Sequence, residues 1–367
     1  MKFRRFGKTG WTVSEIGFGC WGLGGGWGPR DDAEAKRALE RALELGIDFF
    51  DTAAVYGGGH SERILGEVLR KTKRPFRSAA ASGSRTTNPS WRVATKVPAK
   101  TMEWPARPEM KISQAFPTEW IVRCTEASLK RLGLERIDLQ QMHVWTDAWV
   151  EAEEWRKAAD RLKREGKIQA FGVSVNDHEP DSVLKLVATG EIDSVQVIYN
   201  IFEQAPEAKL FPLAQEHGVA PPSDVAGEAG PLKEKRPFGP TSGGGVAVIA
   251  RVPFDEGSLS GAFQPVMRFP RGDWRAGYFR GERLQETCER VERLKPLLDA
   301  DSPTLSALAL QFALSHPAVS TVIPGMRAQA HVEANCAVSD LSPLSAQKRA
   351  KLKANAWARN FYVGARD

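Results

Sequence analysis

One stretch of the sequence decides the fold: Asp51-Thr-Ala-Ala-Val-Tyr56-Gly-Gly-Gly-His60-Ser-Glu62. The apolar run before it, residues 46–50, is typical of a short buried strand. After it, apolar residues recur at helical spacing over 64–69, and we expect Ser61 to cap that helix. Asp51 is therefore expected at a strand end and Tyr56 on the following loop, where β/α barrels carry catalytic groups. Alone, the two residues fit an Asx-turn with a packed ring even better.

Strand and helix patterns alternate along the rest of the chain. Strands are expected at about 16–20, 46–51, 93–97, 137–143, 170–174, 194–198, 246–250 and 319–323. Helices are expected at about 33–45, 64–69, 117–132, 150–164, 181–188, 206–217 and 305–314. Eight such units in one run predict an α/β fold, a (β/α)8 TIM barrel, rather than an open doubly wound sheet. We also expect an N-terminal β-hairpin over residues 3–14 and a C-terminal helical extension.

Two segments interrupt the alternation. Residues 77–88 are rich in Ser, Ala and Arg, and residues 221–245 are rich in Pro, Gly and charge. Neither composition suits a buried core, so we expect surface insertions or disorder at both places. The prediction is therefore one barrel domain over residues 1–367 that carries two insertions.

A dinucleotide fingerprint near the N-terminus does not predict a Rossmann fold. Gly17, Gly19 and Gly22 have the required spacing, but the motif needs a helix to open at its third glycine. Here further glycines, Trp27 and Pro29 follow instead. Any dinucleotide must therefore bind in another way.

Composition and charge restrict the classes of function. A net charge of +6 is spread over the 367 residues, which argues against a dedicated nucleic-acid surface. No apolar run is long enough to span a bilayer, and the basic N-terminus lacks the apolar core of a signal peptide. The four cysteines are scattered without metal-ligand or redox spacing. We expect a cytoplasmic protein with no membrane contact and buried thiols.

Four polar residues are predicted to meet at one rim of the barrel: Asp51, Tyr56, Lys96 and His143. A phenol is a weak acid, with a reference pKa of about 10, and a neighbouring ammonium lowers that pKa. Asp51 would keep Lys96 charged, and His143 would orient a carbonyl oxygen. This set suits proton transfer to a ketone or aldehyde, although each residue also fits a structural ion pair or a packed histidine.

At this point the sequence resembles the aldo-keto reductase superfamily. The resemblance rests on the motifs 51–62, 94–96, 141–143, 172–174, 196–200 and 323–327, and it extends from about Phe3 to Ala337 without the two insertions. It implies that Tyr56 is the general acid, that Lys96 and Asp51 tune it, and that His143 orients the carbonyl. It also implies that NADPH (NADP) binds across the barrel mouth without a Rossmann domain.

The resemblance assigns the cofactor contacts residue by residue. Ser174, Asn176 and Gln196 match positions that grip the nicotinamide carboxamide, and Arg251 stands where many members place an aromatic ring. Pro253, Leu259 and Gly261 match a loop that folds over the pyrophosphate. The adenosine end matches Gly325, Arg327, His331 and Asn335. Gly325 and His331 depart from related members, which have lysine and glutamine there, so NAD stays an alternative to NADP.

Five tryptophans are expected on loops at the catalytic rim, where they would favour a bulky or aromatic carbonyl substrate. They are Trp21, Trp27, Trp104, Trp145 and Trp149. His60 is expected to start a helix rather than to act in catalysis.

Two other functions stay open at this point. The first is a regulatory β-subunit of potassium channels, which shares the fold that the resemblance implies and binds cofactor with little turnover. A metal-dependent barrel hydrolase would need a cluster of His and Asp ligands that the sequence does not offer. The pattern favours a reductase that acts on a small-molecule carbonyl, with no metal.

Overall fold

The computed structural model describes residues 1–28, 30–72, 91–216 and 245–362. The predicted insertion at 77–88 lies outside these residues, and so does the one at 221–245 apart from Gly245.

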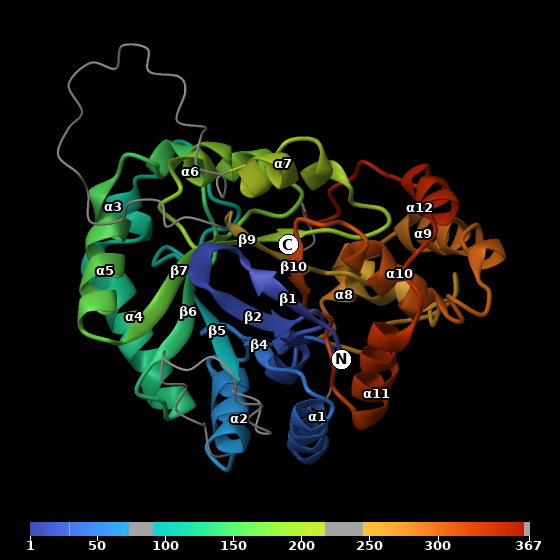
Figure 1. Cartoon of the computed structure of the whole chain (residues 1–367), viewed down its shortest axis with the longest axis horizontal. Coiled ribbons are helices and arrows are strands. Elements are labelled where there is room, and N and C mark those ends of the chain that lie inside the picture. Colours follow the sequence, from blue (N-terminus) through green and yellow to red (C-terminus); the bar gives the residue numbers. More distant parts are fainter. Residues whose placement is uncertain (29, 73–90, 217–244, 363–367) are drawn as a thin grey trace.

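Eight parallel strands form one sheet in the order β10-β9-β8-β7-β6-β5-β4-β3 (Figure 1). The strands are β3 (Phe18–Gly19), β4 (Phe49–Asp51), β5 (Arg92–Val97), β6 (Ile137–Met142), β7 (Ile168–Ser174), β8 (Ser194–Ile198), β9 (Ala247–Arg251) and β10 (Val319–Val322). Parallel bridges join Ile16 to Val322 and Gly19 to Gly325, so the first and last strands meet. The α/β barrel predicted from the sequence is confirmed.

Helices surround the sheet and cover its outer face (Figure 1). They are α1 (Asp32–Glu44), α2 (His60–Leu69), α3 (Ile112–Ala115), α4 (Thr118–Leu132), α5 (Glu153–Arg164), α6 (Leu184–Thr189), α7 (Leu210–Glu216), α8 (Arg275–Tyr278), α9 (Arg283–Glu292), α10 (Leu305–Leu314), α11 (Gln329–Ala337) and α12 (Ala346–Lys353). The last two form the predicted C-terminal extension. The four-residue helices α3 and α8 and the ten-residue α9 were not predicted.

An antiparallel hairpin of β1 (Phe3–Phe6) and β2 (Trp11–Ser14) closes one end of the barrel. The rings of Phe6 and Trp11 pack with residues that point into the barrel, among them Phe49 and Ile249. The predicted hairpin is therefore confirmed, and it leaves the opposite end of the barrel, where the strands end, for a site.

The start of α2 differs from the prediction. The helix begins at His60, as expected for that residue, but its N-cap is Gly59, with φ 84°. Ser61 lies inside the helix, and its hydroxyl donates to the Cys20 carbonyl oxygen at 2.9 Å. The expected cap at Ser61 is wrong because three successive glycines with positive φ carry the chain into the helix without one.

Other boundaries shift by a few residues. β3 is shorter than its predicted strand, and His143 follows β6 rather than ending it. The helix predicted from 150 begins at Glu153, and that predicted over 181–188 divides into a 3-10 turn over Pro180–Val183 and α6. Pro180 is suited to the first position of that turn because the fixed φ of proline matches a helical turn.

The seam between the first and last strands requires glycine at position 19. A Cβ on Gly19 would lie 2.7 Å from the Ile323 oxygen and 2.9 Å from the Pro324 oxygen, and both are backbone atoms. The Gly19 amide itself donates to the Pro324 oxygen at 2.9 Å. The first and last strands can therefore approach this closely because position 19 has no side chain.

We expect Gly19→Ala to lower the free energy of unfolding by about 1–3 kcal/mol, because the added methyl forces the seam apart. Urea unfolding followed by circular dichroism measures the loss. The matched control is Gly325→Ala, where a Cβ would meet no atom within 4 Å, and it should unfold like the parent protein. Equal stability of the two variants would contradict the seam argument.

Candidate active site

A fully buried lysine lies at the centre of the barrel mouth. Lys96, near the end of β5, donates from Nζ to Asp51 Oδ1 at 2.5 Å and to the Thr52 carbonyl oxygen at 2.9 Å. Its third neighbour is the Tyr56 hydroxyl oxygen, at 3.4 Å. The three hydrogens of the ammonium group therefore each face an oxygen.

The second carboxylate oxygen of Asp51 accepts from two amides. Gln196 Nε2 donates to Asp51 Oδ2 at 2.8 Å, and Gln141 Nε2 donates to the same atom at 3.2 Å. Gln196 was predicted to bind a nicotinamide carboxamide, but in this structure its amide group orients Asp51. Gln141 was not predicted as a site residue, although it stands two positions before His143.

Tyr56 and His143 face each other at this centre. Their ring centroids lie 5.8 Å apart at a steep angle, and His143 is nearly buried. Burial raises the pKa of Tyr56 above its ordinary value, while the charge of Lys96 opposes that shift. Burial alone would lower the pKa of Lys96, but Asp51 and Tyr56 raise it overall. At neutral pH the site therefore holds a protonated phenol beside a charged ammonium.

A second ion pair borders the mouth next to His143. The Trp104 ring lies 4.9 Å from the His143 ring, and Trp104 Nε1 donates to Asp177 Oδ2 at 2.8 Å. Arg251, the last residue of β9, donates to Asp177 Oδ1 at 2.8 Å and to the Val175 carbonyl oxygen at 3.1 Å. Arg251 Nε is buried and has no hydrogen-bond partner among the described residues, so it can still donate.

Two other residues from the nicotinamide prediction are placed on β7 and beyond it. Ser174 is buried at the end of β7. Asn176 donates from Nδ2 to the Ala106 oxygen at 2.9 Å and accepts from the Ala106 amide at 3.0 Å. Asn176 therefore fixes the loop after β5, and its side chain is engaged by protein atoms in this structure.

The five predicted pocket tryptophans do not lie together. Trp145 and Trp149 are buried in the main core, with their rings 5.9 Å apart, and both contact further core aromatic rings. They present no surface to a ligand, and the prediction is corrected for these two. Trp21, Trp27 and Trp104 keep partly exposed positions at the mouth. The segment after β6 therefore packs into the core, and the spacing of the tryptophans in the sequence did not reveal this.

Two basic residues closely follow β10, Arg327 and His331. Burial and the neighbouring Arg275 hold the pKa of Arg327 below its usual range, and burial and Arg327 do the same for His331. Arg327 Nη1 donates to the Trp27 carbonyl oxygen at 2.6 Å. Beside it, a side chain on Gly325 would enter open space. The Arg327 guanidinium, with open space at Gly325, fits the phosphate of an adenine dinucleotide. Asn335, also predicted here, is buried on α11.

The long connection after β9 crosses the mouth toward the loop after β3. Of its predicted cofactor contacts, Pro253 is the second residue of the connection, Leu259 is fully buried and Gly261 ends a 3-10 turn with φ 79°. Further on, the Trp274 amide donates to the Gly26 oxygen at 3.3 Å. The Arg275 guanidinium stacks over the Trp27 ring at 4.3 Å.

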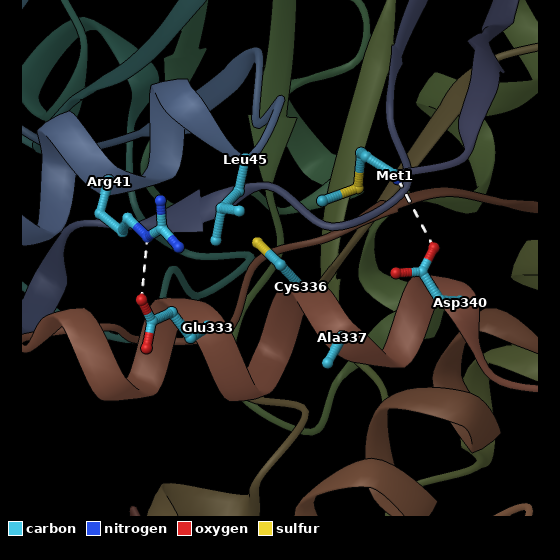
Figure 2. Close-up of a pocket in the computed structure, with 7 residues that line it drawn as sticks. All are labelled: Met1, Arg41, Leu45, Glu333, Cys336, Ala337 and Asp340. Carbon is cyan, nitrogen blue, oxygen red and sulfur yellow. Dashed lines mark hydrogen bonds and ion pairs between the residues drawn. The ribbon is translucent and has the colours of Figure 1, made fainter.

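A surface pocket lies elsewhere, between α1 and α11 (Figure 2). Arg41 and Glu333 form an ion pair of 2.9 Å across it, and Cys336 lies at its wall. It contains none of the four predicted catalytic residues. Among the described residues, no group of three His, Cys, Asp or Glu side chains could hold a metal ion. Within the same ranges, no helix is both long and apolar enough to cross a membrane.

The fold is a parallel β/α barrel, which hosts many kinds of chemistry, and comparison with known sequences gives the family of this chain. The aldo/keto reductase family model matches residues 15–223 and 241–356. The chain therefore belongs to the aldo/keto reductase family and is an NAD(P)-dependent oxidoreductase.

Individual relatives cover nearly the whole chain. The probable aldo-keto reductase 1 of Glycine max is 28% identical over 88% of this chain and 79% of its own length. The NADH-specific methylglyoxal reductase of Escherichia coli is 26% identical over 93% and 94%, and a probable voltage-gated potassium channel subunit beta of Arabidopsis thaliana is 27% identical over 94% and 93%. Among solved structures, the holo form of aldo-keto reductase AKR11C1 from Bacillus halodurans is 28% identical, with a TM-score of 0.66 over 98% and 97%.

One buried carboxyl group at the mouth was not predicted. Burial raises the pKa of Glu256 to about 8, against an opposing hydrogen bond from the Tyr362 hydroxyl. The negative charges of Asp255 and Asp177 add to the rise, and Arg251 opposes it. Glu256 therefore keeps its proton in the folded protein at neutral pH and loses it on unfolding, since its ordinary pKa is 4.5.

This shift predicts a pH-dependent loss of stability. A carboxyl group whose pKa is higher in the folded than in the unfolded protein stabilises the fold fully at pH values below its pKa in the unfolded protein. This contribution to the free energy of unfolding falls by about 1.4 kcal/mol per pH unit as the pH rises from the unfolded to the folded pKa. We expect Glu256→Gln to gain stability relative to the parent protein as the pH rises from 4.5 to about 8. Unfolding titrations of both proteins across this pH range measure the difference between their free energies of unfolding. The contributions of the other carboxyl groups are common to both proteins and cancel in that difference. A difference independent of pH would contradict the raised pKa.

Proposed function

We propose that the protein is an NADPH-dependent reductase of aldehydes or ketones in which Tyr56 is the general acid. The observation that carries this proposal is the Lys96 ammonium group, which lies 2.5 Å from Asp51 Oδ1 and 3.4 Å from the Tyr56 hydroxyl oxygen. A buried cation so close to a protonated phenol stabilises the phenolate that forms when the proton leaves.

The proton transfer follows from this arrangement. When bound, the cofactor supplies the hydride to the carbonyl carbon. Tyr56 donates its hydroxyl proton to the carbonyl oxygen, and the phenolate that remains is paired with Lys96. His143, whose ring faces Tyr56 at 5.8 Å, orients the same carbonyl oxygen. Asp51, held by two glutamine amides, keeps Lys96 charged and in position.

The cofactor contacts proposed from the sequence divide into two regions. At the nicotinamide end, Ser174, Gln196 and Arg251 lie around the catalytic centre, and the unpartnered Nε of Arg251 can donate to a ligand. At the adenosine end, Arg327 is the main contact for a 2′-phosphate, with Arg275 and His331 beside it. The half-buried Arg327 guanidinium, which has no ion-pair partner among the described residues, supports NADP rather than NAD, although the Escherichia coli relative is described as NADH-specific.

The substrate is proposed to be a small carbonyl compound held between Trp104, His143 and the Arg251–Asp177 pair. Trp104 contributes an apolar wall 4.9 Å from His143, and Arg251 contributes a donor on another side. Without Trp145 and Trp149, the tryptophans favour a bulky aromatic substrate less than the sequence suggested.

A second candidate is a cofactor-binding regulatory subunit with little turnover. It is supported by similarity to the potassium channel subunit of Arabidopsis thaliana. A panel of aldehydes and ketones assayed with NADPH separates the two functions, because slow turnover beside tight cofactor binding would favour the regulatory subunit.

We expect Tyr56→Phe to lower the rate of carbonyl reduction by roughly 10²–10⁴-fold, because it removes only the donated proton. NADPH oxidation followed at steady state measures this loss, and fluorescence titration should give nearly unchanged NADPH affinity. The matched control is Tyr199→Phe, whose hydroxyl donates to Glu207 at 2.7 Å, and it should keep full activity. Near-normal turnover of Tyr56→Phe would end the assignment.

We expect Arg327→Ala to weaken NADPH binding at least tenfold more than NADH binding. Only NADPH carries a 2′-phosphate, and a guanidinium–phosphate contact is a charge-assisted hydrogen bond of about 1.5–3 kcal/mol. Fluorescence titrations with both cofactors measure the ratio of dissociation constants. Arg161→Ala, which removes an exposed pair with Glu165 on α5, is the control. Equal losses for the two cofactors would assign Arg327 to structure alone.

A further inference from the structure

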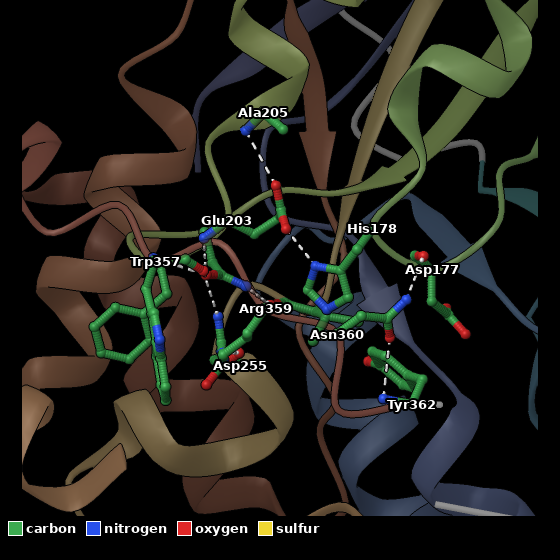
Figure 3. Close-up of polar contacts among 12 residues, drawn as sticks. Asp177, His178, Glu203, Ala205, Asp255, Trp357, Arg359, Asn360 and Tyr362 are labelled. Atoms are coloured by element: carbon green, nitrogen blue, oxygen red, sulfur yellow. Dashed lines mark hydrogen bonds and ion pairs between the residues drawn. The ribbon is translucent and has the colours of Figure 1, made fainter. Parts of the chain in front are cut away.

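The chain returns to the barrel mouth after its last helix. Beyond α12, the Trp357 amide donates to the Phe202 oxygen at 2.8 Å, which fixes the segment to the loop after β8. Asn360 then reaches the Asp177 backbone oxygen in the loop after β7 (Figure 3). We name residues 357–362 the latch.

The latch makes two polar contacts with the connection after β9. Arg359 pairs with Asp255, and both side chains are almost fully buried (Figure 3). The Tyr362 hydroxyl donates to Glu256. The ring of Tyr362 also stacks on Trp274, with centroids 5.6 Å apart and an angle of 13° between the planes. Removing one partner of a buried ion pair is strongly unfavourable, because the other charge stays in a low-dielectric site.

Three residues near the start of the connection after β9 have an unfavourable backbone conformation. Val252, Asp255 and Glu256 have φ of 55°, 47° and 56°, although none is a glycine. Such left-handed residues are uncommon, and each stores strain that persists only when surrounding contacts fix it. Two of the three are the acidic residues that Arg359 and Tyr362 contact. The latch therefore supplies contacts that hold the strained segment in place.

The same connection is attached at its far side to the loop after β3. Trp274 packs on Trp21 with centroids 5.3 Å apart, and its amide donates to the Gly26 oxygen at 3.3 Å. We name residues 252–275 the crossing segment. It spans from β9 past the proposed pyrophosphate contacts to Arg275, beside the proposed phosphate site at Arg327.

We propose that the latch holds the crossing segment closed over the bound cofactor, and that Arg359 and Tyr362 are positioning residues that set the rate of cofactor release. This inference rests on the proposed cofactor site. A ligand beneath the crossing segment leaves only when that segment lifts. Lifting it breaks the Arg359–Asp255 and Tyr362–Glu256 contacts, and the strain at residues 252, 255 and 256 then favours the open form.

The rate of NADPH release tests the latch directly. We expect Tyr362→Phe, which keeps the ring on Trp274 and removes only the hydroxyl, to accelerate release about 10-fold or more. Arg359→Gln should accelerate release by about 10- to 100-fold, because a charge-assisted contact is lost. Stopped-flow chasing of bound NADPH, read by energy transfer from the protein tryptophans, measures both rates.

A matched control removes another ion pair near the C-terminus. Lys353, on α12, pairs with Glu207 at 2.6 Å and makes no polar contact with the crossing segment among the described residues. Lys353→Gln should release NADPH at the parental rate. Acceleration in this control equal to that of Tyr362→Phe would show a general loosening of the C-terminus and would overturn the latch.

A double variant isolates the Tyr362–Glu256 contact. Because Tyr362→Phe removes the donor and Glu256→Ala removes the acceptor of the same hydrogen bond, their combined effect on release should be smaller than the product of the single effects. Full multiplication would show that the two side chains act separately and would overturn the proposal.

The outcomes also separate this inference from the proposed function. If the parent protein binds and oxidises NADPH but Tyr362→Phe releases it at the parental rate, the latch fails and the function stands. If the parent protein does not bind NADPH, both fail. Should Arg359→Gln not fold, the result for Tyr362→Phe decides alone.

Discussion

The buried ion pair between Lys96 and Asp51 is the interaction on which the site depends. Taking two charges out of water is costly, and the cost is offset only where every donor and acceptor finds a partner. Here the Thr52 carbonyl oxygen completes the lysine side, and Gln141 and Gln196 complete the aspartate side. Since these residues lie on or directly after barrel strands, neighbouring backbones fix their positions.

Barrel closure determines which end of the molecule can carry such a site. The hairpin places Phe6 and Trp11 against the inward-pointing residues of the strands, so one end is filled with apolar rings. At the seam, Gly19 lets the first strand approach the last one closely. The Lys96–Asp51 pair lies at the opposite end, at the carboxyl ends of β5 and β4, where loops of different lengths can reach it. This division between a stabilising end and a chemical end is usual in β/α barrels.

The sequence predicted the local part of this arrangement well and the long-range part poorly. The strand before Asp51 and the helix after His60 follow from periodicity within about twenty residues. The position of Trp145 does not, because a buried and a rim tryptophan have the same local pattern. Ser61 matched a capping residue, but the glycines before it had already turned the chain.

Contacts between distant segments left no periodic signal at all. The Arg359–Asp255 pair joins residues 104 positions apart, and neither residue belongs to a motif. Gln196 is a second example of a long-range contact. The family resemblance assigned its amide to a ligand, whereas in the structure that amide donates a hydrogen bond to Asp51, 145 positions earlier. Residues 77–88 and 221–244 lie outside the described residues, and the predicted insertions stay predictions.

Charge pairing at the mouth gives a final argument about the ligand. Lys96 is paired with Asp51, Arg251 with Asp177, and Arg359 with Asp255. Each of these cations is thus compensated within the protein. Arg275 is paired with Asp273 at 2.6 Å, whereas Arg327 forms no ion pair among the described residues. Arg275 repels the Arg327 guanidinium, and Asp273 offsets part of that repulsion. A half-buried guanidinium without an ion-pair partner is stabilised when an anion joins it. Among these arginines, the one without an ion pair in the described part of the chain thus lies at the adenosine end of the proposed site, where a phosphate would pair with it.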